Sequence, residues 1–167
     1  MSDGKFEQTA GVGVVCAMAG NRGTTRQEVK VTAATEMIRS YPADLGAVDR
    51  DALIHCIEEC VSCAQACTAC ADAYLSESDD QLPILRTCIR SAENCADLCN
   101  ATARMLSRHT GYDADVTRTV LQACIIVCRS CGDECASHAS QHEHCRACAE
   151  ACRSCEQTCQ ALIEALG

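Results

Sequence analysis

The sequence predicts an all-α protein: an antiparallel up-down-up-down four-helix bundle with a cysteine-lined core, plus a short N-terminal helix. The first observation behind this is that cysteines recur at alternating spacings of four and three residues. That rhythm places side chains on one face of an α-helix. The second is that four such stretches are joined by short turn-forming segments, and short connections make successive helices antiparallel.

Residues 56–70 carry the clearest stretch, in which five cysteines fill every position of a heptad seam. A strand is excluded because its alternation with period two would scatter these thiols over both faces. The rhythm recurs three more times, with one step left empty near Ser91. The four stripes contain 17 of the 18 cysteines: Cys56, Cys60, Cys63, Cys67, Cys70, Cys88, Cys95, Cys99, Cys124, Cys128, Cys131, Cys135, Cys145, Cys148, Cys152, Cys155 and Cys159.

Composition excludes several classes of function. A chain of 167 residues is long enough for one domain, yet it has no Trp and one Phe, so Cys and Ala take the core positions that Leu normally occupies. The net charge of −9 with no basic block excludes nucleic acid as a partner. No apolar run approaches the roughly 20 residues that span a bilayer, so no membrane association is expected.

Three segments are expected along the chain. Residues 1–23 form a Gly-rich flexible tail without an export signal, and Cys16 lies in it off every stripe. Residues 24–48 form a short accessory helix, opened by a capping box from Thr25, and a linker. Residues 49–167 form the bundle. Its four helices are expected over residues 49–76, 78–108, 113–140 and 142–166, with Asp49 and Asp113 at helix starts and Gly111 at a helix stop.

Counting outward from each turn predicts which thiols share a level. Cys56 is expected with Cys99, Cys124 and Cys159. The next levels are Cys60 with Cys95, Cys128 and Cys152, then Cys63 with Cys131 and Cys148, then Cys67 with Cys88, Cys135 and Cys145. Beyond the first level the stripes become apolar, and this end is expected to be closed by Leu53, Val120, Leu106, Leu121, Leu162 and Leu166. The other end is expected to be a more polar mouth, with Tyr74 and Ile84 nearby.

So many thiols in a core point to a soft metal, because reactivity rather than packing usually decides why cysteine is kept. Thiolates bind Cu(I), Zn(II) and iron–sulfur clusters. A Cu(I) ion that displaces one thiol proton leaves the core neutral, whereas Zn(II) with four thiolates leaves a double negative charge. Zinc-thiolate storage and an iron–sulfur electron carrier remain the alternatives. An enzyme is not expected, because the sequence offers no isolated cysteine with a base partner and no carboxylate within the cysteine stripes.

Two repeats carry a resemblance to a known family: Cys60-x-x-Cys63-x-x-x-Cys67-x-x-Cys70 and Cys148-x-x-x-Cys152-x-x-Cys155-x-x-x-Cys159. They resemble the bacterial copper storage proteins, and the lack of an export signal is similar to their cytosolic branch. The resemblance implies storage and detoxification of many Cu(I) ions along the bundle core, and a homotetramer. Copper would then arrive from a copper chaperone or a small thiol.

The histidines divide by register. His138 and His142 continue the cysteine stripes at the polar mouth and are candidate copper ligands or relays, since imidazole is an acceptable copper ligand. His144 and His55 are one residue out of register and are expected to flank helix interfaces or face solvent. His109 follows a helix C-terminus, where an interaction with the helix dipole or a capping role is expected.

Overall fold

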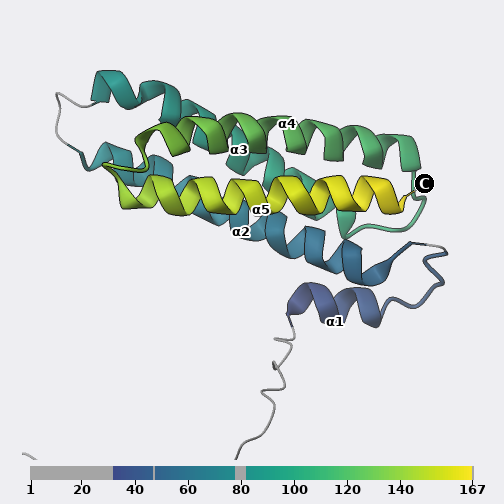
Figure 1. Ribbon diagram of the computed structural model, residues 1–167. Coiled ribbons are helices and arrows are strands. Elements are labelled where there is room, and N and C mark those ends of the chain that lie inside the picture. The colour runs from purple at the N-terminus through teal and green to yellow at the C-terminus, as the bar shows by residue number, and fades with distance from the viewer. Residues whose placement is uncertain (1–31, 47, 78–81, 167) are drawn as a thin grey trace, which may run out of the picture. The chain divides into compact units, whose positions relative to one another are not determined.

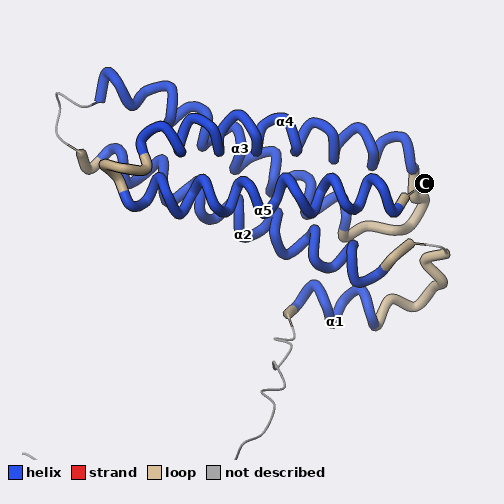
Figure 2. Tube along the Cα trace, in the orientation of Figure 1, coloured by secondary structure: helices blue, strands red, loops and turns tan. Residues whose placement is uncertain are grey.

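The computed structural model describes residues 32–46, 48–77 and 82–166, apart from the side chains of residues 83 and 84. Its described residues form five helices and no strand: α1 (Ala33–Arg39), α2 (Arg50–Leu75), α3 (Leu82–Leu106), α4 (Ala114–His138) and α5 (Glu143–Ala165). The four long helices run side by side, and each of them packs against two neighbours, in the cyclic order α2, α3, α4, α5 (Figure 1). Figure 2 shows the short loops that join α3 to α4 and α4 to α5. The four-helix bundle that the sequence predicts is confirmed.

Capping side chains set the starts of two bundle helices. Asp49 Oδ1 accepts hydrogen bonds from the amides two and three residues ahead, at 3.0 and 3.1 Å. Asp113 does the same for α4, with both distances at 3.0 Å. Gly111, just before this start, has a φ of +68°, which glycine adopts at little steric cost. The starts predicted at Asp49 and Asp113 are therefore confirmed.

Two helix boundaries bear on the functional site. α4 ends at His138, and α5 begins at Glu143 with His142 as its N-cap, at φ −129° and ψ 110°. The backbone of His142 is therefore extended, and a helical stripe cannot be continued through it. The predicted opening of the second long helix at residue 78 lies outside the described residues, as do the tail with Cys16 and the capping box at Thr25.

α1 is a short helix on the outside of α2. Its N-cap Thr32 is extended, at φ −104° and ψ 167°, so the helix starts at Ala33. The hydroxyls of Thr32 and Thr35 both donate to Glu58 Oε1 on α2, and Ile38 is buried in the core. These contacts hold the accessory helix on the outside of the bundle.

Cysteine is the main residue type in the core of the bundle. All 17 stripe cysteines are at most 1 % exposed. The step left empty near Ser91 is filled by Ala92, which is fully buried. At one end the stripes give way to four buried leucines: Leu53, Leu106, Leu121 and Leu162. Leu166 packs against this core and Val120 is half-buried, so the predicted apolar closure is confirmed.

The capped helices and their apolar contacts are complete without a metal ion. We therefore expect the fully reduced, metal-free protein to fold into a helical bundle, unlike a small zinc finger, which needs its ion to fold. Circular dichroism of the reduced apo-protein is the measurement. A coil spectrum that becomes helical only when copper is added would contradict the expectation.

The leucine end should carry much of the stability of the apo-protein. Leu121 is fully buried there, so Leu121→Ala should lower the free energy of unfolding by about 2–5 kcal/mol through the lost apolar contact and the cavity left behind. The matched control is Leu75→Ala, because Leu75 is 63 % exposed on α2 and should change stability by no more than about 0.5 kcal/mol. Urea unfolding of the two reduced variants compares them, and equal losses would refute the assignment.

Candidate metal centre

Most of the cysteine sulfurs, from Cys56 to Cys148, form one continuous network of contacts. Cys88 and Cys135 form a further pair, which Tyr74 and His144 connect to Cys145 and Cys70. Neighbouring Sγ atoms lie between 3.5 Å (Cys99 and Cys128) and 4.0 Å (Cys67 and Cys131) apart, and all 17 are free thiols. A first-row metal ion that binds two sulfurs at about 2.3 Å each holds them at most about 4.6 Å apart. The spacing in the metal-free core already suits metal–thiolate bridging without a change in the helix positions.

Sets of four thiols converge along the core, and successive sets share members. In each set all four sulfurs lie within 4.8 Å of one another; five of the sets are Cys60/Cys124/Cys155/Cys159, Cys99/Cys124/Cys128/Cys155, Cys63/Cys95/Cys99/Cys128, Cys63/Cys67/Cys95/Cys152 and Cys67/Cys131/Cys148/Cys152. In structural zinc proteins each four-ligand site is isolated, and no ligand belongs to two sites. Overlapping sets instead favour multinuclear clusters with bridging thiolates.

The predicted levels are correct between α3 and α4. Cys99 lies 3.7 Å from Cys124, and Cys95 lies 3.7 Å from Cys128. Cys88 lies 3.6 Å from Cys135, again as predicted.

The levels predicted for most of α2 are wrong by about one step. Cys60 meets Cys155 and Cys159, at 3.6 and 3.9 Å, rather than Cys152. Cys152 instead lies 3.8 Å from Cys63. The levels were counted from an expected turn between residues 76 and 78, but α2 ends at Leu75 and α3 begins at Leu82. The turn is therefore centred farther along the chain, and each residue of α2 pairs about one cysteine step farther along α3.

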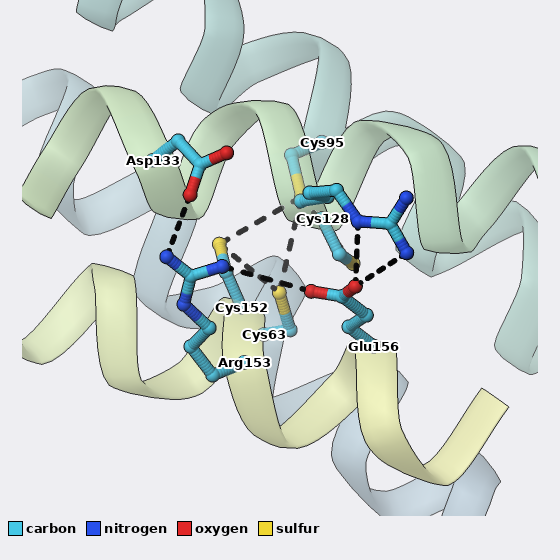
Figure 3. A network of polar contacts seen from close by, with 8 residues as sticks. Cys63, Cys95, Cys128, Asp133, Cys152, Arg153 and Glu156 are labelled. Carbon is cyan, nitrogen blue, oxygen red and sulfur yellow. Dashed lines mark hydrogen bonds and ion pairs between the residues drawn. The ribbon is translucent and has the colours of Figure 1, made fainter. Parts of the chain in front are cut away.

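The core holds no compensating charge. Figure 3 shows its middle, where one thiol from each helix takes part: Cys63 (α2), Cys95 (α3), Cys128 (α4) and Cys152 (α5). The nearby ion pairs of Arg153 with Asp133 and Glu156 lie at the solvent-facing side of α4 and α5. Among the described residues, none of the buried ones carries a formal charge. A cation that enters must therefore displace protons to keep the core neutral.

Neighbouring thiols shift one another's acidity in opposite directions. Hydrogen bonds with Cys124 and Cys155 raise the pKa of Cys60 well above that of a free thiol. Hydrogen bonds with Cys128 and Cys155 lower the pKa of Cys124. The thiols thus hydrogen-bond to one another through their S–H protons. Metal binding should release these protons to solvent, so the affinity should rise with pH.

Tyr74 closes the thiol network at the end opposite the leucines. Its side chain is fully buried, and its hydroxyl lies 2.8 Å from Cys88 Sγ and 2.7 Å from Cys145 Sγ. Burial raises the pKa of Tyr74, so the phenol keeps its proton and donates it to one of the two sulfurs. The predicted place of Tyr74 near the mouth is confirmed, while the side chain of Ile84 lies outside the described residues.

His144 is the histidine that reaches the thiols. Its Nδ1 lies 3.4 Å from Cys70 Sγ and 3.6 Å from Cys145 Sγ, and its ring meets Tyr74 edge-on with centroids 4.7 Å apart. The expectation that His144 merely flanks an interface or faces solvent is wrong. The missed signal is its position four residues before Cys148, which keeps it on the flank of the α5 stripe.

His138 and His142 both contact carboxylates. His142 Nδ1 lies 2.9 Å from Glu77 Oε1, and His138 Nε2 lies 3.6 Å from Glu134 Oε1. His138 keeps its predicted alignment with the α4 stripe, because it is the last residue of α4, whereas His142 is an extended N-cap and leaves the α5 stripe. His142 still lies beside the thiol-bound His144, with ring centroids 5.4 Å apart. Their role as copper ligands stays a prediction.

The two remaining histidines, His55 and His109, differ in how far they are exposed to solvent. His55 is exposed on α2, as expected. His109 packs edge-on against Tyr41 with centroids 5.2 Å apart, and its buried Nε2 has no hydrogen-bond partner. Burial lowers the pKa of His109, which favours the neutral ring. A neutral ring has no charge with which to stabilise a helix dipole, so the predicted dipole role is not supported.

Comparison with known proteins agrees with this geometry. The family model described as copper storage protein matches residues 49–164, which is more than half of the chain. The chain belongs to the copper storage protein family. No curated protein sequence matches it. None of the helices in the described ranges is long and apolar enough to cross a membrane.

Solved structures of other copper storage proteins share the fold. The Streptomyces lividans copper storage protein Ccsp, loaded with 10 copper equivalents, is 66 % identical with a TM-score of 0.76; the match covers 78 % of this chain and 98 % of that one. The structure of a cytosolic copper storage protein from S. lividans with five coppers is 67 % identical, with a TM-score of 0.69, 71 % of this chain and 98 % of that chain covered. The resemblance found in the sequence is confirmed, and copper storage is favoured over the zinc and iron–sulfur alternatives.

Proposed function

We propose that this copper storage protein holds many Cu(I) ions, on the order of one per core thiol, and thereby both stores and detoxifies copper. The observation that carries the proposal is the network of thiol contacts, with Sγ atoms 3.5–4.0 Å apart from Cys56 to Cys148 and no buried charge among the described residues. One-for-one exchange of Cu(I) for thiol protons keeps such a core neutral. The ligands are the 17 stripe cysteines, and the protein performs no chemical conversion.

Charge argues against zinc storage, and the arrangement of the cysteines argues against an iron–sulfur protein. Each Zn(II) with four thiolates would leave a double negative charge, and several such sites would lie within one core that has no cation to offset them. Iron–sulfur clusters take four cysteines each and need no continuous stripe along a bundle. Cu(I) is the ion among the three whose charge and preference for sulfur both suit this core.

We infer that copper enters at the histidine end. The opposite end is closed by buried leucines, which offer no ligand to an arriving ion. His144 contacts Cys70 and Cys145, with His142 beside it and His138 at the end of α4. A neutral imidazole binds copper but is a harder ligand than thiolate, so it should pass the ion inward.

We also propose where the protein is located, how it assembles and how it receives copper. A cytosolic location is supported by the S. lividans relative described as cytosolic. A homotetramer is proposed from the resemblance of the cysteine repeats to the copper storage proteins. A copper chaperone or small thiol would deliver the ion. The copper-binding domain is residues 49–167, and residues 1–23 and 24–48 are a tail and an accessory segment.

Anaerobic titration of the reduced protein with Cu(I) tests the function. We expect saturation on the order of one copper ion per core thiol, with about one proton released for each ion bound, because every thiol that becomes a ligand must lose its proton. The measurements are elemental analysis of the saturated protein and proton release in weak buffer. Saturation at about four zinc ions with copper bound no better, or an iron–sulfur chromophore in anaerobically purified protein, would sink the proposal.

Removing the histidines tests the route of uptake. His144→Ala should slow copper transfer from a Cu(I) chelator while leaving capacity nearly unchanged, because most ligands lie deeper. The double variant His138→Ala with His142→Ala should also slow loading, and stopped-flow absorbance measures both. The matched control is His55→Ala, since His55 is exposed on α2. If these variants load at the wild-type rate and a change at the leucine end alters the rate instead, the mouth lies at the other end.

A further inference from the structure

Glu77 lies among the histidines at the end of the bundle opposite the leucines, which carries His138, His142 and His144. It directly follows the C-cap of α2, and its amide donates to Tyr74 O at 3.2 Å. Its Oε1 lies 2.9 Å from His142 Nδ1 and 3.5 Å from His144 Nε2. One carboxylate oxygen therefore faces two imidazoles from the start of α5, and the uptake route described above uses no part of it.

The orientation of His144 shows what this carboxylate does. The Nδ1 of His144 faces the sulfurs of Cys70 and Cys145, and its Nε2 faces Glu77. An ionised carboxylate only accepts hydrogen bonds, so it favours a proton on Nε2. In a neutral imidazole the other nitrogen then carries the lone pair. Nδ1, the atom beside the thiols, is thereby left free to bind a metal ion.

Among the described residues, Glu77 is the acceptor that faces this nitrogen. His144 Nε2 is buried and makes no full hydrogen bond in the described part of the chain, which leaves the carboxylate at 3.5 Å as its ion-pair partner. Histidines that ligate metals commonly turn their second nitrogen toward a carboxylate, which sets the tautomer and raises ligand basicity. The chain Glu77–His144–Cys70/Cys145 has this arrangement before any metal is bound.

We propose that Glu77 is the positioning residue for copper uptake: it holds His144 in the tautomer whose Nδ1 can bind an arriving Cu(I), and it tethers His142 beside that site. The inference rests on the proposed function and deepens it. Binding at Nδ1 uses a lone pair and releases no proton. Transfer of the ion to Cys70 or Cys145 releases one thiol proton to solvent, so the charge balances.

Glu77 also links the end of α2 to the start of α5. The experiment must therefore distinguish a role in holding the two helices together from a role in setting the tautomer of His144. A mechanical tie would affect stability but not the tautomer of His144. The tautomer is measured on ¹⁵N-histidine-labelled, reduced, copper-free protein by long-range ¹H–¹⁵N correlation. We expect the wild-type protein and Glu77→Gln to show the Nε2–H form of His144, because the amide oxygen of glutamine still accepts. Glu77→Ala should shift His144 toward the Nδ1–H form.

Loading kinetics supply the second readout. Glu77→Ala should slow transfer from a Cu(I) chelator by about tenfold or more, the usual effect of removing a carboxylate behind a metal-binding histidine. Copper capacity should not change, and Glu77→Gln should recover most of the rate. The matched control is Glu143→Ala, which removes the same charge one residue from His144 but from a carboxylate that pairs with Arg146. This control should load at the wild-type rate.

A double-variant comparison decides whether Glu77 acts through His144. In a His144→Ala background, Glu77→Ala should slow loading no further. Additive effects, or a Glu77→Ala variant with an unchanged tautomer and unchanged loading, would overturn the inference. Circular dichroism checks that each variant is folded, and Glu77→Gln provides the test should the alanine variant unfold. A wild-type protein that takes up no copper would instead refute the function, an outcome that the tautomer spectra of the copper-free protein distinguish from a failure of positioning.

Discussion

The burial of uncharged thiols in mutual contact is the constraint on which the rest of this structure depends. Sulfur atoms 3.5–4.0 Å apart along the core leave room for bridging ions but none for a buried counter-charge. A thiolate core without cations would be prohibitively unfavourable, so in the metal-free protein the thiols hold their protons. Copper storage follows from this state, because each Cu(I) replaces a proton without adding net charge.

The same constraint explains how the helices are held together. Cysteine and alanine are small, so the bundle takes its larger apolar contacts from the leucines at one end and from side chains such as Ile57 and Ile125 at the helix interfaces. Aspartate caps fix the starts of α2 and α4. These elements are separate from the ligands, which lets the scaffold exist with any number of sites filled.

The sequence was sufficient for the parts of the structure that depend on helical periodicity. The cysteine spacing predicted the faces, and Asp49 and Asp113 predicted two helix starts to within one residue. Periodicity does not report how far one helix slides along another, which is why Cys60 was assigned to the wrong level. It also fails where the chain leaves the helix: His142 is extended, so extrapolating a stripe to it missed the thiol-facing His144. Glu77 contacts both histidines from a loop, and no pattern in the sequence indicated that.

The closed leucine end has a consequence for the order in which ions move. A tube that is filled and emptied through one mouth behaves as a stack: the last ion to arrive is the first to leave. With uptake at the histidine end, ions held by Cys56 and Cys159, next to the leucines, would exchange slowest with the surroundings. Ions at Cys70 and Cys145, beside His144, would exchange fastest. One chain would thus hold one population of copper ions that exchanges rapidly and another that exchanges slowly. Both would be bound by cysteine and would differ only in their distance from the open end.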